Sequence, residues 1–316
     1  MLHINSRWLV ALPAKNEAER LAGALDALEA AAARCTLPVS ALVLANDCED
    51  ETEALAVAWA TNPRRVTLVT REVRLPPALA HAGGARSTAV GAAFAAFGAA
   101  PTDLLLTTDA DARLAPDALS CFEAAFSRGA DLALAKITCE TDPLDPVSDL
   151  ALAWGTPQVE WRHKVRQLAE TFCTGRVPWP PLHDDYGGAG IACTVAAYGR
   201  LGGFRPVPSD EDKSLVAAAD GAGLKVDRQS GAVVHVLARA TGRAMGGMAT
   251  ALARNEAEAR LGGARLVERH DLTIARLRAH PSHAEAFVAE AAALEPVEDA
   301  IAGIDRVLAG YAAGAA

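Results

Sequence analysis

Residues 104–113 read LLLTTDADAR, in which an apolar run passes directly into two aspartates, Asp109 and Asp111, separated by one residue. A short apolar run of this kind is typical of a strand that is buried on both faces of a sheet. In open α/β sheets, ligands bind beyond the carboxyl ends of the strands, which is where these two carboxylates would project. Neighbouring carboxylates repel each other unless a cation neutralises them, so the pair predicts a site for Mg²⁺ or Mn²⁺.

The sequence before this stretch alternates short apolar runs with alanine-rich segments of helical length. This order predicts an α/β fold with a mostly parallel, doubly wound sheet and helices on both of its faces. With 51% hydrophobic residues, the chain has enough apolar side chains for the core of such a sheet. The predicted strands cover residues 8–12, 39–45, 65–70 and 103–108, and the predicted helices cover residues 17–33, 49–60 and 82–97.

The second half of the sequence is less regular. Residues 140–187 are rich in Pro, Asp, Trp and His, and they predict an insertion that forms much of the acceptor wall with Trp154, Trp161 and Trp179. Core packing explains tryptophans at least as often. After Gly247 the pattern becomes polar and helical up to the last residue. We therefore expect a main domain over residues 1–240, which includes the insertion, and a helical C-terminal extension over residues 241–316.

Charge and cysteine spacing exclude several classes of protein. The formal net charge of −9 argues against a nucleic-acid-binding protein, because such proteins present basic patches to phosphates. No uninterrupted apolar run reaches 18 residues, so no membrane-spanning segment is predicted. The first apolar run ends at Pro13 and is too short for a signal peptide, which favours a cytoplasmic location. Six cysteines without a CxxC pair indicate neither a zinc ribbon nor a redox motif.

Further motifs share the main domain with the aspartate pair. In chain order they are residues 12–17 (LPAKNE), 46–52 (NDCEDET), 83–89 (GGARSTA), 187–192 (GGAGIA), 201–204 (LGGF) and 209–215 (SDEDKSL). This set and its order resemble the inverting glycosyltransferases of family two, which have the GT-A fold. The resemblance covers roughly residues 7–237. It implies a nucleoside-diphosphate sugar as donor and a divalent metal, Mn²⁺ or Mg²⁺, as cofactor.

By this resemblance, the first three motifs and the aspartate pair hold the donor nucleotide. Asp47 would read the base, although Asn46 stands where the family has an aspartate, so the identity of the base is left open. A structural alternative is that Asn16 caps a helix and Glu17 favours its positive end. The residues implied in donor binding are Pro13, Ala14, Asn16, Glu17, Asp47, Arg86 and Asp109.

The resemblance also assigns the metal ligands and the base. Asp111 would hold the metal directly, Asp109 would lie nearer the ribose, and His235 would complete the metal site, although a lone histidine on a strand is more often a partly buried side chain. Inverting transfer needs a carboxylate that takes the proton of the acceptor hydroxyl. Asp212 matches that base and Glu211 would shape the site; alternatively, these acids favour the start of a helix.

The resulting interpretation is a glycosyltransferase that moves a sugar to a hydroxyl of a small-molecule or glycan acceptor with inversion, while retention stays open. Arg239 and Arg243 lie in a glycine-containing stretch that would close over the donor phosphates. A homodimer through the C-terminal helices is a further hypothesis. Two alternatives are a haloacid-dehalogenase-like phosphatase that uses Asp109 and Asp111, and a catalytically silent protein that binds a nucleotide-sugar. Arg113 occupies the place where that phosphatase motif usually has Thr or Val.

Overall fold

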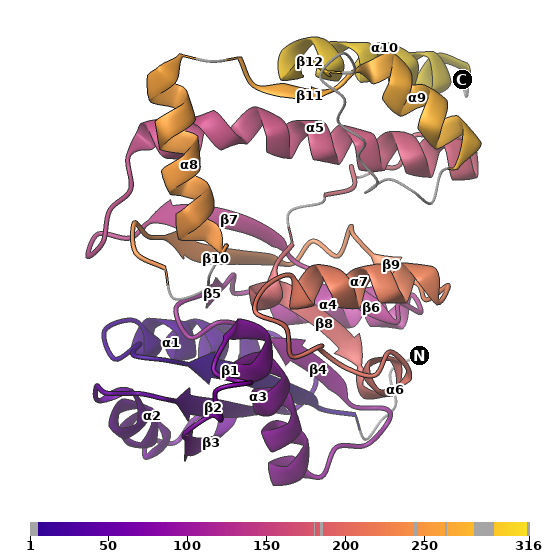
Figure 1. The fold of residues 1–316 in the computed structure, drawn as a ribbon. Coiled ribbons are helices and arrows are strands. Elements are labelled where there is room, and N and C mark those ends of the chain that lie inside the picture. The colour runs from indigo at the N-terminus through magenta and orange to yellow at the C-terminus, as the bar shows by residue number, and fades with distance from the viewer. Residues whose placement is uncertain are drawn as a thin grey trace.

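The computed structural model describes residues 6–179, 181–183, 186–242, 246–262, 264–280 and 294–314. Within these ranges the main sheet has seven strands in the order β3-β2-β1-β4-β8-β6-β9 (Figure 1). Strand β1 pairs in parallel with β2 and β4, and only β8 runs antiparallel to its neighbours β4 and β6. The predicted mostly parallel α/β sheet is therefore confirmed. The strands are β1 (Trp8–Ala14), β2 (Val39–Asn46), β3 (Val66–Val73), β4 (Leu104–Thr107), β6 (Leu132–Leu134), β8 (Ile191–Thr194) and β9 (Val226–Asp227).

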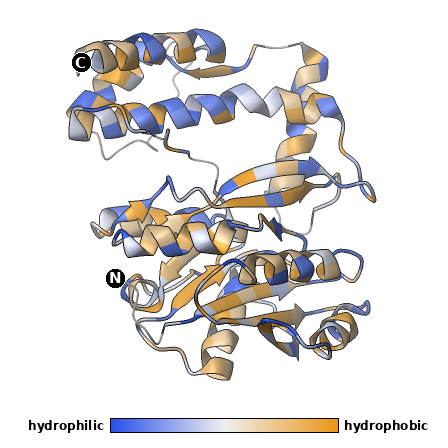
Figure 2. Ribbon diagram, turned by 180° about the vertical axis from the view of Figure 1, so that it is seen from behind, coloured by the Kyte–Doolittle hydropathy of each residue, from blue (hydrophilic) through white to orange (hydrophobic). Residues whose placement is uncertain are grey.

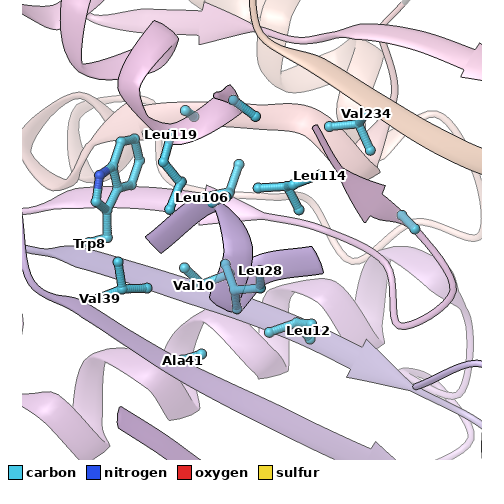
Figure 3. Close-up of a cluster of buried hydrophobic side chains, with 14 of the residues drawn as sticks. Trp8, Val10, Leu12, Leu28, Val39, Ala41, Leu106, Leu114, Leu119 and Val234 are labelled. Carbon is cyan, nitrogen blue, oxygen red and sulfur yellow. The ribbon is translucent and has the colours of Figure 1, made fainter. Parts of the chain in front are cut away.

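Helices cover both faces of the main sheet, as predicted. Alternate residues of β1 enter different cores: Trp8 and Val10 pack with the helices of one face, and Ala11 packs with those of the other (Figure 3). This alternation follows from the two-residue period of a strand. Helices α1 (Leu21–Ala32) and α4 (Ala118–Ser127) form the first layer. The second layer consists of α3 (Ala82–Phe97), α6 (Val195–Arg200) and α7 (Glu211–Gly221), and α2 (Thr52–Ala60) lies beside β3.

The third predicted strand differs from the expectation of burial on both faces. Strand β3 is an edge strand, and after Val66 its residues are half-buried or exposed in near alternation. The prediction failed here because a short run rich in Val and Leu also fits a half-buried strand.

A second sheet of three strands lies between the main sheet and the upper helices. Its central strand, β10 (Val233–Ala238), pairs in parallel with β7 (Lys136–Thr141) and antiparallel with β5 (Arg113–Leu114). Because β5 follows β4 by only a few residues, this pairing brings the end of β10 close to the Asp109–Asp111 turn. The small sheet therefore carries residues from late in the sequence to the carboxyl edge of the main sheet.

The expected irregular insertion contains a long helix. Helix α5 (Asp149–Thr174) has 26 residues, with Pro157 in its interior. Trp161, Val165 and Leu168 of α5 are buried against the last helices of the chain, so Trp161 is a core residue of this layer and not part of a binding wall. Trp179 is exposed, and Trp154 contacts Glu258 and Arg265.

The C-terminal region forms the rest of this upper layer. It consists of α8 (Met248–Leu261), β11 (Leu266–Glu268), α9 (His270–Ala279), β12 (Leu294–Pro296) and α10 (Val297–Gly314). Figure 2 shows that hydrophobic colour dominates the main sheet, while the upper helices mix polar and apolar residues. Among the described residues, no helix has the length and apolar character needed to cross a membrane.

Candidate active site

A cavity of about 300 Å³ lies at the carboxyl ends of β1 and β2 and beside the turn after β4. The segment after β10 and the start of α8 form its opposite wall. This is the edge of the sheet at which α/β folds bind ligands. The predicted site residues that line the cavity are Pro13, Glu17, Arg86, Asp109 and Asp111.

The loops after β1 and β2 hold each other in strained conformations. Asn16 and Asp47 have φ values of 52° and 50°, in the left-handed region that residues other than glycine seldom adopt. The side-chain Oδ1 of Asn16 accepts a hydrogen bond of 2.8 Å from the backbone N–H of Glu49. Asn16 does not cap α1, which begins at Leu21. Its contact instead fixes the two loops together at the cavity, and Ala14 is buried at the end of β1.

Asp47 has one engaged and one unengaged carboxylate oxygen. Its Oδ1 accepts a hydrogen bond of 3.0 Å from Leu75 N–H. Its Oδ2 is buried and has no hydrogen-bond partner among the described residues. A buried carboxylate oxygen is costly to leave unpaired, but Asp47 does not line the cavity, so a ligand N–H would reach this atom only after a rearrangement of the loop.

Arg86 is buried, and its guanidinium joins three parts of the site. Nε donates to Glu211 Oε1 at 2.9 Å, Nη2 donates to Asp109 Oδ1 at 2.9 Å, and Nη1 donates to the carbonyl of Gly188 at 2.8 Å. Burial alone would lower the pKa of Arg86, but the carboxylates of Asp109 and Glu211 raise it, so the side chain stays charged. With its nitrogens engaged in this way, Arg86 holds other site residues in place.

The two adjacent acids at the start of α7 occupy different environments. Glu211 is buried and paired with Arg86. Asp212 is half-buried; its Oδ2 accepts from Gly188 N–H at 3.0 Å and its Oδ1 from Lys213 N–H at 2.7 Å. Gly188 therefore binds Asp212 through its N–H and Arg86 through its carbonyl. These contacts connect Asp212, through Gly188 and Arg86, to Asp109.

Arg239, the residue directly after β10, joins Asp111 to Glu17. Its Nη2 lies 2.5 Å from Asp111 Oδ2 and 3.3 Å from Glu17 Oε1. Burial raises the pKa of Asp111 and so does the charge of Asp109, while Arg239 opposes this shift. The sequence indicated Arg239, Asp111 and Glu17 as separate site residues. It did not indicate that Arg239 pairs with both carboxylates. Arg243 lies outside the described residues.

His235 does not reach the aspartate pair. Its Nδ1 lies 2.8 Å from Thr138 Oγ1 and 3.2 Å from Glu140 Oε1, on the face of β10 opposite to buried Val234 and Val236. Within the described part of the chain, no three His, Cys, Asp or Glu side chains form a metal-binding group. Asp109 and Asp111 nevertheless fit a hard divalent cation, which takes oxygen ligands and can share them with phosphates and water.

Residues 9–148 match the model of glycosyl transferase family 2. The match covers less than half of the chain, and it shows which family this segment is similar to. The matched segment includes the loop after β1 and the Asp109–Asp111 turn, and it confirms the resemblance. No curated protein matches the chain.

Among solved structures, the chain is similar to TarS 1–349 of S. aureus, with 14% identity, a TM-score of 0.47, and coverage of 73% of this chain and 60% of that one. The same protein in complex with UDP-GlcNAc gives 15% identity, a TM-score of 0.49, and coverage of 96% and 71%. The mannosyltransferase PcManGT of Pyrobaculum calidifontis, in complex with GDP-Man and Mn²⁺, has 17% sequence identity and a TM-score of 0.48. The match covers 98% of this chain and 80% of that one. This chain spans less than two thirds of the first of these proteins.

Proposed function

We propose that the protein transfers a sugar from a nucleoside-diphosphate sugar to a hydroxyl of a small-molecule or glycan acceptor, with inversion and with a divalent cation. The observation that carries the proposal is the cavity at the carboxyl edge of the sheet, which is lined by Asp109 and Asp111 and connected through Arg86 to Asp212. The family match of residues 9–148 supports the reaction class.

In this proposal the nucleoside lies over the strained loops after β1 and β2. Asp47 Oδ2, which is buried and without a hydrogen-bond partner in the described structure, would accept an N–H of the base. Each of the four bases offers a ring N–H or an exocyclic amine, so this contact does not choose among them. UDP and GDP, whose bases have a ring N–H at the pairing edge, are the first nucleotides to test.

Asp111 and Asp109 would hold Mn²⁺ or Mg²⁺ together with the donor diphosphate. The cation supplies charge neutralisation of the leaving nucleoside diphosphate. Asp109 is kept in place by Arg86, Asp111 lies beside Arg239, and both carboxylates line the cavity. His235 is not included among the proposed ligands, because its ring contacts Thr138 and Glu140.

Asp212 would take the proton of the acceptor hydroxyl as that oxygen attacks the anomeric carbon. A positioned general base of this kind contributes roughly 10²–10⁴-fold to the rate. Glu211 acts through Arg86 and has no free path to the acceptor, because it is buried and paired. Attack from the Asp212 side, with the diphosphate leaving from the Asp111 side, gives inversion.

Calorimetric titration tests the donor site. Nucleoside diphosphates and nucleotide-sugars are titrated, each with Mn²⁺, Mg²⁺ or EDTA, into the wild type, Asp111→Ala and the control Asp117→Ala, whose exposed carboxylate lies at the start of α4. We expect metal-dependent binding of one nucleotide that Asp111→Ala loses and Asp117→Ala keeps. Absence of binding to every compound under every metal condition would refute the proposal.

A further inference from the structure

The position that the proposed function gives to a cation is bordered by a side chain of the protein itself. Arg239 Nη2 lies 2.5 Å from Asp111 Oδ2, and both side chains are largely buried, with 16% and 13% exposure. Asp109 and Asp111 both line the cavity, and each is paired with one arginine, Asp109 with Arg86 and Asp111 with Arg239. An arginine and a divalent cation cannot share one carboxylate at this distance without strong repulsion.

Arg239 also pairs with a second carboxylate, that of Glu17. Its Nη1 lies 3.3 and 3.4 Å from the two oxygens of Glu17, whose side chain is 7% exposed. Its Nη2 lies close to both Glu17 and Asp111. A change of side-chain conformation can therefore free Asp111 while the pair with Glu17 persists.

The backbone after Arg239 is anchored independently of this side chain. The N–H of Thr241 donates to Asp145 Oδ2 at 2.8 Å, and the N–H of Ala240 donates to the carbonyl of Asp145 at 3.3 Å. Because these bonds do not involve Asp111 or Glu17, a displacement of the guanidinium leaves the wall of the cavity intact. Arg239 and the next residues of this wall, Thr241 and Gly242, all line the cavity.

We propose that Arg239 neutralises Asp111 in the donor-free protein and moves to the donor diphosphate when the cation and the nucleotide bind together. The guanidinium fork suits phosphate oxygens as well as it suits a carboxylate, so the exchange keeps its charge paired. This inference rests on the function proposed above. It makes Arg239 a positioning residue that couples the two binding events: it opposes the cation alone and favours the cation with a diphosphate.

The test measures Mn²⁺ alone, by electron paramagnetic resonance of the free ion, and then UDP and GDP in the presence of Mn²⁺, by calorimetry. We expect Arg239→Gln to bind Mn²⁺ alone at least about tenfold more tightly than the wild type, and the diphosphate with Mn²⁺ about tenfold more weakly. Asp111→Asn added to Arg239→Gln should remove the gain in Mn²⁺ affinity. A matched control, Arg128→Gln, removes an exposed arginine that pairs with Asp227 and should change neither affinity.

The double variant Glu17→Gln/Arg239→Gln separates direct competition from total charge, and it avoids an unpaired buried Glu17. Its charge in this cluster equals that of the wild type, because one negative and one positive charge are removed. Mn²⁺ affinity above that of the wild type supports competition for Asp111, and a return to the wild-type value overturns it. Unchanged affinities in Arg239→Gln overturn this inference alone, whereas a wild type that binds no nucleotide overturns the proposed function with it.

Discussion

At residue 188 the backbone passes so close to Arg86 that a Cβ would lie 2.1 Å from its Nη2. Gly188→Ala must therefore displace a buried guanidinium from Asp109 and Glu211. Leaving buried charges without their partners costs about 3–5 kcal/mol. We expect the free energy of unfolding to fall by about 3 kcal/mol, as measured by urea denaturation, and nucleotide binding to be lost.

Gly91 provides the matched control, because it lies on the same helix as Arg86 and has no other atom within 4 Å of the point that a Cβ would occupy. Gly91→Ala should raise the free energy of unfolding by about 0.5–1 kcal/mol, since glycine is a poor helix former. Equal effects of the two substitutions would show that the contact with Arg86 carries no special weight.

Cys193 gives the protein a sensitivity to alkaline pH. Burial raises the pKa of this thiol from 9.0 to about 12, so the unfolded chain loses the proton at lower pH than the folded one. The stability that results is present below pH 9 and is lost as the pH rises toward 12. Between pH 8 and pH 10.5 we expect the free energy of unfolding of Cys193→Ala to fall by about 1–2 kcal/mol less than that of the wild type. Parallel pH curves would contradict this.

The sequence identified the carboxylates of the site but not the residues that arrange them. Asp109 and Asp111 could be predicted because they follow an apolar strand directly. Arg86 could not be predicted as an organiser, because its partners lie 23, 102 and 125 residues away. Arg239 contacts Glu17 across 222 residues. Such roles depend on which loops the sheet order brings together, and no local pattern records that order.

At the scale of elements, α5 departs most from prediction. Pro157 lies within it, and Pro143 and Pro146 precede it, a pattern that favours irregular structure. Packing of Trp161, Val165 and Leu168 against the C-terminal helices supplies the stability that local propensity does not. Most strands and helices of residues 8–107, by contrast, were predictable, because short apolar runs alternate there with alanine-rich segments of helical length.

Pro157 should therefore lower the free energy of unfolding, because it interrupts a helix that tertiary packing stabilises. It lacks the N–H of an interior helical bond, which costs about 3 kcal/mol in a regular helix. We expect Pro157→Ala to raise the free energy of unfolding by about 1–3 kcal/mol in chemical denaturation. Pro146→Ala, in the turn before α5, should change it by no more than about 0.5 kcal/mol. A loss of stability in Pro157→Ala would show that the helix is adapted to the proline.

For the whole molecule, the homodimer through the C-terminal helices stays a prediction. Leu261 at the end of α8 is 85% exposed, and Leu266 and Leu272 are exposed in the next two elements. Light scattering after size-exclusion chromatography should give twice the chain mass of 32.8 kDa for the wild type. We expect Leu261→Asp to lower that mass to a single chain, while Leu144→Asp, in an exposed position before α5, leaves it unchanged. A wild type that elutes as one chain at all concentrations would refute the dimer.

The upper helical layer is made of two stretches that are far apart in the sequence, α5 and residues after Gly247. A protein shortened at residue 240 would keep α5 and expose the apolar face formed by Trp161, Val165 and Leu168. Deletion of the C-terminal region alone therefore leaves an α/β core with an exposed apolar surface. The insertion that contains α5 must be removed as well. The same reasoning applies to ancestry, because neither stretch buries its apolar face alone. The tail and the insertion are expected to have been gained, and to vary among relatives, as a pair.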